Sequence, residues 1–327
     1  MFATKRTIIL LLSLIAVILS TYFFQKNTPQ LPTIAIANYG PHSSLEETIK
    51  GFKETLEKFG YKENEQIQFD MNHVNFDPTQ IIQMLTKLHS KNPKLLLAIT
   101  TPVAQSAQNV FKDKPIVFAS ITDPVEAGLL KNENESTANI TGASERQDFN
   151  ALINFIKSIL PNAKRIGMLY ATGEANDVAL LKSFEHEAEK HNMILVSKAI
   201  DHPRDVPLGI ASFKDKVDLI YVGTSGPIQP TLPAIVHAAD GLGIPIINAD
   251  SDAVHKNLVL ASFGVSFYQI GANAAKIAAS IMGGKDIKDI PPMHPSLEDH
   301  HGFISKKQTK KFNIQLPKDE KNISILE

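Results

Sequence analysis

Short hydrophobic runs alternate with stretches of helical spacing along most of the chain. Most of the runs are continuously apolar, as strands covered on both faces of a sheet should be. Nine of them are expected to form strands: Thr33–Asn38, Gln66–Asn72, Leu95–Ile99, Pro115–Ala119, Arg165–Tyr170, Met193–Ala199, Val217–Val222, Ile244–Asn248 and Leu258–Ser262. Amphipathic helices are expected to begin near Ser44, Asp77, Thr101, Asp148, Gly173, Asp205, Pro227 and Phe267. This alternation is typical of α/β proteins with parallel sheets.

Two of the predicted helices carry start signals. Ser44-Leu45-Glu46-Glu47 is a capping-box pattern, in which a serine and a glutamate three residues later satisfy free backbone N–H groups. Thr101 is expected to cap a helix whose first position is Pro102, because proline lacks the N–H that the first turn leaves unpaired.

The element pattern occurs twice. The first series starts with a helix after Asp77-Pro78, continues with a strand that ends before Thr100-Thr101-Pro102, and closes with another helix and strand. The second series has the same order of elements, with its first helix after His202-Pro203 and its strand ending before Thr224-Ser225-Gly226. The two series lie about 125 residues apart, which indicates an internal duplication. The sequence therefore predicts two similar lobes with a cleft between them.

Composition narrows the class of protein. The 327 residues include 33 basic and 34 acidic side chains, a balance that argues against a nucleic-acid partner. The chain has no cysteine, which excludes disulfides, a thiol nucleophile, zinc–cysteine sites and a lipid-modified cysteine anchor. Its length suits two domains.

The N-terminal segment is the strongest indication of location. Lys5 and Arg6 precede the uncharged run Thr7–Phe24, which would be about 27 Å long as a helix, close to the thickness of a bilayer core. We expect residues 1–26 to form a cleaved signal peptide or a retained signal anchor, followed by a linker at 27–32. The basic flank predicts a periplasmic or other extracytoplasmic location, tethered to the inner membrane if the helix is uncleaved.

Ligands of open α/β sheets bind beyond the carboxyl ends of the strands. Thr100 and Thr101 stand at such a helix start, where hydroxyl and free N–H groups favour a carboxylate, although Thr101 could simply cap its helix. The acidic candidates to hold an ammonium group, each equally a possible cap, are Asp123, Glu174, Asp250 and Asp252. Tyr39 could stack on an aromatic ligand.

Catalytic and metal interpretations are weaker. Gly223-Thr224-Ser225-Gly226 is a fragment of a nucleophile elbow, but Pro227 stands where the second glycine is required. Asp299-His300-His301, with His294 nearby, matches no recognised metal-site spacing. We therefore expect no enzyme, no catalytic residue, no cofactor and no metal.

The chain from Thr33 to Leu316 resembles the substrate-binding components of ABC transporters in the tryptophan/tyrosine-type family. The residues that carry this resemblance are His42-Ser43-Ser44-Leu45, Ala98-Ile99-Thr100-Thr101-Pro102-Val103-Ala104-Gln105, Pro115–Phe118 with Thr122–Leu129, Asn139–Gly142, Leu160–Lys164, Glu174–Asn176, Leu232–Ala234 and Asp250–Asp252. The resemblance implies a type I periplasmic binding protein-like fold, with two Rossmann-like lobes, parallel sheets, a multi-strand hinge and a ligand cleft. It places lobe 1 at 33–142 plus 266–290 and lobe 2 at 143–265 plus 291–327.

The resemblance also implies a function. The chain would capture an aromatic amino acid or related small molecule as a monomer and deliver it to an ABC permease with its ATPase subunit. The candidate ligand-binding residues are Tyr39, His42, Ser43, Thr100, Thr101, Thr122, Asp123, Glu174, Asn176, Thr224, Ser225 and Asp250. Relatives often carry an acid where this chain has Thr224-Ser225-Gly226, so either another residue holds the ligand's amino group or the ligand differs. A membrane-anchored ligand sensor and an extracytoplasmic hydrolase using the same cleft are the alternatives.

Overall fold

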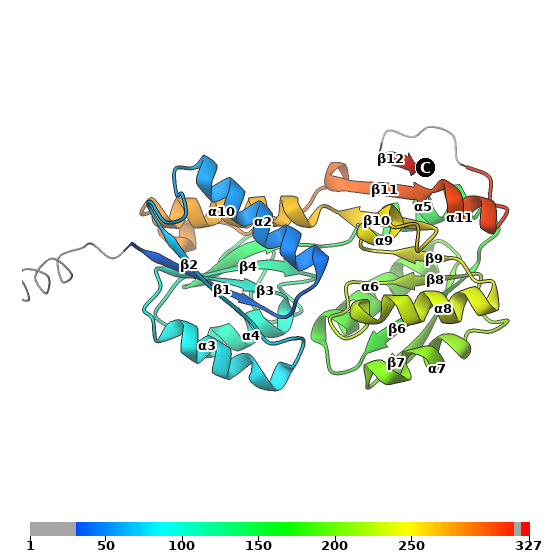
Figure 1. Cartoon of the computed structure of the whole chain (residues 1–327), viewed down its shortest axis with the longest axis horizontal. Helices are drawn as coiled ribbons and strands as arrows, with labels where there is room; N and C mark the ends of the chain where they lie inside the picture. Colours follow the sequence, from blue (N-terminus) through cyan, green and yellow to red (C-terminus); the bar gives the residue numbers. More distant parts are fainter. Residues whose placement is uncertain (1–30, 317–321) are drawn as a thin grey trace, which may run out of the picture.

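The computed structural model describes residues 31–316 and 322–327, which form two α/β lobes side by side (Figure 1). The predicted signal or anchor segment, 1–26, lies outside the described residues. Within 31–316 and 322–327, no helix combines the length and apolarity needed to cross a bilayer.

Lobe 1 is built on a five-stranded parallel sheet in the order β2-β1-β3-β4-β5. Its strands are β1 (Thr33–Asn38), β2 (Gln68–His73), β3 (Leu95–Ile99), β4 (Ile116–Ile121) and β5 (Ile140–Ser144). Helices α2 (Ser43–Lys58) and α10 (Phe267–Met282) cover one face of the sheet. Helices α3 (Ile81–His89) and α4 (Thr101–Val110) cover the other face. The 3₁₀ turn η1 (Pro78–Gln80) directly precedes α3.

Lobe 2 has a seven-stranded sheet in the order β12-β11-β10-β9-β8-β6-β7, parallel except for the β10–β11 pair. Its strands are β6 (Arg165–Ala171), β7 (Ile194–Ile200), β8 (Leu219–Val222), β9 (Ile246–Asn248), β10 (Ala261–Val265), β11 (His300–Ser305) and β12 (Ile323–Leu326). Its helices are α5 (Phe149–Ile159), α6 (Ala175–Lys190), α7 (Val206–Ala211), α8 (Leu232–Leu242), α9 (Asp252–His255) and α11 (Lys306–Lys311), with 3₁₀ turns η2 (Pro203–Asp205), η3 (Gln229–Thr231) and η5 (Leu297–Asp299).

The α/β fold with two parallel-dominated sheets confirms the predicted fold class, and each of the nine predicted runs overlaps a strand. The duplication is also present. Asp77-Pro78 and His202-Pro203 each open a 3₁₀ turn, η1 and η2, that leads directly into a helix on the outer side of its lobe.

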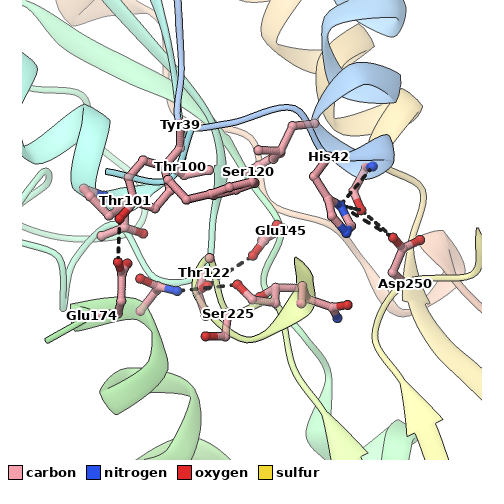
Figure 2. A pocket seen from close by; sticks show the side chains of 18 of the residues that line it. Tyr39, His42, Thr100, Thr101, Ser120, Thr122, Glu145, Glu174, Ser225 and Asp250 are labelled. Carbon is pink, nitrogen blue, oxygen red and sulfur yellow. Dashed lines mark hydrogen bonds and ion pairs between the residues drawn. The ribbon is translucent and has the colours of Figure 1, made fainter. Parts of the chain in front are cut away.

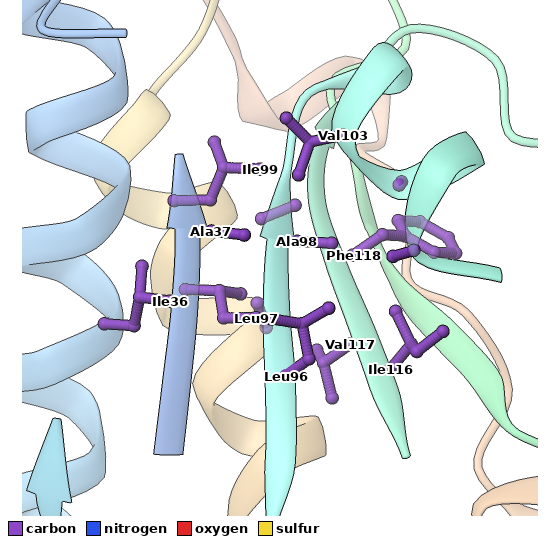
Figure 3. Packing of buried hydrophobic residues seen from close by; sticks show 14 of the residues in the cluster. Ile36, Ala37, Leu96, Leu97, Ala98, Ile99, Val103, Ile116, Val117 and Phe118 are labelled. Atoms are coloured by element: carbon purple, nitrogen blue, oxygen red, sulfur yellow. The ribbon is translucent and has the colours of Figure 1, made fainter. Parts of the chain in front are cut away.

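The core of lobe 1 follows from the apolar strands. All five residues of β3 are fully buried, and Leu96, Leu97 and their neighbours on β1 and β4 fill the space between the sheet and its helices (Figure 3). Gly51 and Gly271 let α2 and α10 cross closely, because a Cβ atom at Gly271 would lie 1.9 Å from the carbonyl oxygen of Thr48. This close packing fixes the N-terminus of α2 at the edge of the cleft.

The chain crosses between the lobes three times. It passes from β5 to α5 through residues 145–148, from β10 to α10 at Ser266, and from lobe 1 back to β11 through residues 294–299. η4 (Ile287–Asp289) and an isolated bridge between Met293 and Ala143 precede the last crossing. The multi-strand hinge therefore runs along one side of the interface between the lobes.

Both predicted helix starts differ from the structure by one or two residues. His42 is the N-cap of α2, and its ring nitrogen accepts a hydrogen bond from the Ser44 N–H, so Ser44 lies inside the helix. Thr100, not Thr101, is the N-cap of α4, and its side chain makes no capping bond. Neither side chain that was expected to cap therefore does so, and both Ser44 and Thr101 line the cleft instead.

The histidines near the last crossing have structural partners. The backbone N–H of Asp148 donates to His300 Nε2 at 3.0 Å, and His300 Nδ1 lies 2.8 Å from the Ser296 carbonyl. His294 Nδ1 lies 2.8 Å from Ser144 Oγ. Within the residues that the structure describes, no group of three or more His, Cys, Asp or Glu side chains is placed to hold a metal ion.

Candidate ligand-binding cleft

A cavity lies between the lobes at the carboxyl ends of their strands (Figure 2). It contains about 560 Å³ of empty space, a figure that includes the open solvent at its mouth. Lobe 1 and the first crossing supply Tyr39, His42, Ser44, Leu45, Phe76, Thr100, Thr101, Pro102, Ser120, Thr122, Glu145 and Phe267. Lobe 2 supplies Glu174, Asn176, Thr224, Ser225, Gly226, Gln229, Pro230 and Asp250.

Ten of the twelve candidate residues from the sequence line this cavity. The other two do not reach it. Ser43 lies on the far side of the α2 N-terminus, where its hydroxyl donates to Asp252 Oδ2 at 3.1 Å. Asp123 Oδ1 accepts from the N–H groups of Val125 and Glu126, and its other oxygen lies 3.3 Å from Arg146 Nη2, so it holds a turn.

The start of α4 forms the lobe 1 side of the cavity. Thr100 adopts φ 78° and ψ 156°, a region in which β-branched residues are outliers. Its Oγ1 is buried and has no hydrogen-bond partner among the described residues. Because no side chain caps α4, its first free N–H groups are also open to an anionic ligand.

Two unpaired acceptors lie on the lobe 2 side. Glu174 Oε1 accepts a 2.9 Å hydrogen bond from the Tyr39 hydroxyl of lobe 1, as Figure 2 shows, whereas Glu174 Oε2 is buried without a partner in the described part of the chain. Asn176 Oδ1 is likewise buried without a partner in the described part of the chain. The amide nitrogen of the same side chain, Nδ2, donates to Asp177 Oδ1 at 3.1 Å. Two acceptors without a donor suit a ligand that carries N–H groups.

The electrostatics of the cavity favour a cation on this side. Burial raises the pKa of Glu174 to about 7, with the Tyr39 hydrogen bond opposing the rise and the charge of Asp177 adding to it. Burial also raises the pKa of Asp177 to about 6. Among the described residues, no lysine or arginine lines the cavity. A ligand ammonium group would supply the missing positive charge.

Glu145 is a cavity residue that sequence reasoning missed. Its carboxylate accepts a 3.1 Å hydrogen bond from Thr122 Oγ1 of lobe 1, and the Thr224 hydroxyl of lobe 2 also bonds to it. Burial raises its pKa to about 7. No apolar run indicates β5, and although a crossing between the lobes is expected near Thr141–Ser144, the residue just after it was not expected to line the cleft. Ser120, Phe76, Phe267 and Gln229 were missed as well.

Asp250 is committed to the contact between the lobes. Its Oδ2 accepts a 2.5 Å hydrogen bond from Ser44 Oγ at the start of α2, and its Oδ1 accepts from the Asp252 N–H at 3.0 Å. His42 Nδ1 lies 4.0 Å from the same carboxylate. Together with the Tyr39–Glu174 bond, these contacts hold the lobes in a closed arrangement.

Two sequence comparisons show which known proteins this chain is similar to. The family model for ABC transporter substrate-binding proteins matches residues 33–322. A curated protein named tyrosine-binding protein, from Clostridioides difficile strain R20291, is 34% identical over 258 residues, covering 79% of this chain and 74% of that protein.

Two solved structures are informative about conformation. An ABC domain from Streptococcus pneumonia in complex with L-Trp is 27% identical, with a TM-score of 0.83, covering 88% of this chain and 97% of that one. The ligand-free, open structure of a substrate-binding protein with adhesive properties from Clostridium difficile is 30% identical and covers 91% and 99%, but its TM-score is 0.71. The lower similarity to an open structure agrees with the closed arrangement seen here. On the match of nearly the whole described chain, this protein belongs to the ABC transporter substrate-binding protein family.

Proposed function

We propose that this chain is the extracytoplasmic substrate-binding component of an ABC importer and that its ligand is an aromatic amino acid. Membership of the family supports the first part. The names of two relatives, a tyrosine-binding protein and a domain solved with L-Trp, support the second. The chain acts as a monomer that delivers its ligand to a membrane permease, whose ATPase partner supplies the energy.

The observation that carries the proposal is the placement of unpaired polar atoms on both sides of the cavity. Thr100 Oγ1 and the open N-terminus of α4 suit the carboxylate of an amino acid. Across the cavity, Glu174 Oε2 and Asn176 Oδ1 suit its ammonium group. A zwitterion satisfies both sets at once, whereas a sugar or an anion leaves a buried carboxylate without a counter-charge.

The two sets lie on different lobes, which couples binding to closure. Only the closed arrangement brings the α4 start and the Glu174 loop to the same ligand, so the ligand shifts the population towards it. Thr101, Thr122, Thr224, Ser225 and the aromatic walls complete the enclosure. Closure of this kind lets a permease distinguish the loaded protein from the empty one.

The test is a calorimetric titration of the full chain with L-tryptophan, L-tyrosine, L-leucine, ribose and glucose. We expect selective binding of the aromatic amino acids, with the ligand recovered unaltered. Glu174→Gln should weaken that binding about 10- to 100-fold, because a hydrogen bond to a charged group is worth about 1.5–3 kcal/mol. Glu185→Gln, at an exposed position of α6, the helix that follows Glu174, is the matched control and should leave the affinity unchanged.

Several outcomes would contradict the proposal. Binding of a sugar but of no amino acid would remove the ligand class, and chemical conversion of the ligand would support the hydrolase alternative. Equal affinity of the Glu174→Gln and Glu185→Gln variants would remove Glu174 from the ammonium site.

A further inference from the structure

The loop after β2 contains an unusual backbone. Asn75 and Phe76 are consecutive residues with φ of 51° and 62°. Asparagine tolerates this left-handed region, but a bulky residue such as phenylalanine rarely adopts it. Strained residues of this kind persist only where the surrounding structure holds them, and they gather at functional sites.

Three contacts hold Phe76 in place. Its N–H donates a 2.8 Å hydrogen bond to the carbonyl oxygen of Tyr39, at the end of β1. Its ring meets the Tyr39 ring edge-on, with centroids 5.5 Å apart and planes at 80°. It also lies directly over Gly40, where a Cβ atom would come within 2.5 Å of the ring. The glycine and the strained turn together place the ring in the wall of the cavity.

The two other aromatic rings that line the cavity, Tyr39 and Phe267, are placed differently. Tyr39 is 1% exposed, its hydroxyl is engaged by Glu174, and its ring packs against Gly226 of lobe 2. Phe267 stands in the first turn of α10, between this cavity and a second groove behind Asp250. Phe76 is the half-buried ring beside Tyr39 whose position depends on a strained backbone.

We infer that Phe76 determines the specificity of the cavity for aromatic side chains, and that the turn at Asn75–Phe76 serves to present its ring to the ligand. The inference rests on the proposed function. An aromatic ligand gains from an edge-to-face or offset contact with Phe76, because aromatic pairs are attracted beyond the effect of buried area. An aliphatic ligand gains only the burial, so Phe76 separates the two classes.

The experiment compares the affinities of L-tryptophan, L-tyrosine and L-leucine for the full-length protein and four variants: Phe76→Leu, Phe69→Leu, Phe267→Leu and Gly40→Ala. Phe76→Leu keeps an apolar side chain but removes the ring. It should weaken binding of both aromatic ligands about 3- to 10-fold and leave leucine unchanged within about 2-fold. Phe69→Leu is the matched control, because Phe69 is a partly buried ring on β2 of the same lobe that packs on Phe52, outside the cavity.

The outcomes separate this inference from the proposed function. If the unchanged protein shows no preference for aromatic ligands, the proposed ligand class fails and the inference fails with it. If the preference exists and Phe76→Leu retains it, or only Phe267→Leu reduces it, the inference alone is overturned. Gly40→Ala decides the matter if Phe76→Leu does not fold, because it displaces the ring without deleting it and should reduce the same preference.

Discussion

At the scale of single residues, Thr100 combines strain with an unpaired hydroxyl. A non-glycine residue at φ 78° and ψ 156° costs about 1–3 kcal/mol. Thr100→Gly should relieve that cost, partly offset by about 0.5–1 kcal/mol for the greater freedom of glycine in the unfolded chain. We therefore expect urea denaturation to give a free energy of unfolding higher by about 0.5–2 kcal/mol, while calorimetry shows weaker ligand binding.

The control for Thr100→Gly is Asp215→Gly. Asp215 also has a positive φ, 59°, but it is exposed and distant from the cavity, so its replacement should stabilise the fold without changing ligand affinity. A Thr100→Gly variant that is less stable than the unchanged protein would contradict the idea that this residue is strained for the sake of the site.

Residues of the candidate site could be predicted from the sequence only where the order of strands and helices places them at the cleft. Thr100, Thr101 and Glu174 stand directly between an apolar strand and a helix, so their place at the cleft follows from the order of elements. Phe76 could not be predicted, because its backbone conformation contradicts the preference of its own side chain. Glu145 could not be predicted either, because the contacts that bring it to the cavity come from Thr122 and Thr224, which are distant in the sequence.

At the scale of elements, the start of α2 acts as a clasp between the lobes. Ser44 Oγ donates to Asp250 Oδ2, and Ser43 Oγ donates to Asp252 Oδ2, so two carboxylates of lobe 2 meet the positive end of a lobe 1 helix. Ser44→Ala removes one such bond, worth about 1.5–3 kcal/mol. We expect the ratio of closed to open molecules of the protein without ligand to fall about 10-fold or more, seen as a larger radius of gyration in X-ray scattering.

A matched control for the clasp is Ser106→Ala. The Ser106 hydroxyl donates to the carbonyl of Pro102 within its own helix, and Ser106 does not line the cavity. Its loss should leave the radius of gyration unchanged. An unchanged radius for Ser44→Ala as well would mean that other contacts hold the lobes together.

The elements themselves were largely predictable, because buried parallel strands read as apolar runs. The strands that sequence patterns missed are β5, β11 and β12. β5 is interrupted by Gly142, which is required because a Cβ atom there would lie 2.2 Å from the Phe118 carbonyl, and β11 begins with two histidines. The N-cap of α2 was placed two residues late, at Ser44, because the partner of the Ser44 hydroxyl, Asp250, is 206 residues away.

At the scale of the whole molecule, the cleft concentrates carboxyl groups that burial makes harder to ionise. The pKa values of Glu145 and Glu174 are raised to about 7, and that of Asp177 to about 6, from ordinary values of 4.5 and 3.8. Between about pH 5 and pH 7 these three groups therefore bind more protons in the folded protein than in the unfolded chain. Their contribution to the free energy of unfolding falls as the pH rises through this range.

A ligand with an ammonium group reverses this trend at the cleft. Placed beside Glu174, the positive charge lowers the pKa of that carboxyl towards its ordinary value, so binding near neutral pH releases a proton. Proton release requires that the affinity for the ligand increase as the pH rises from about 5 to 7.

For the protein without ligand, urea denaturation should show a free energy of unfolding lower at pH 7.5 than at pH 5 by several kcal/mol, since one unit of pKa shift is worth about 1.4 kcal/mol. For ligand binding, titration calorimetry in buffers of different ionisation enthalpy measures the number of protons released. The Glu174→Gln variant has no such proton to lose, so it should bind more weakly and with less dependence on pH. Proton uptake on binding, or a pH profile that the variant leaves unchanged, would place the ammonium group elsewhere and assign the raised pKa of Glu174 to the closed arrangement alone.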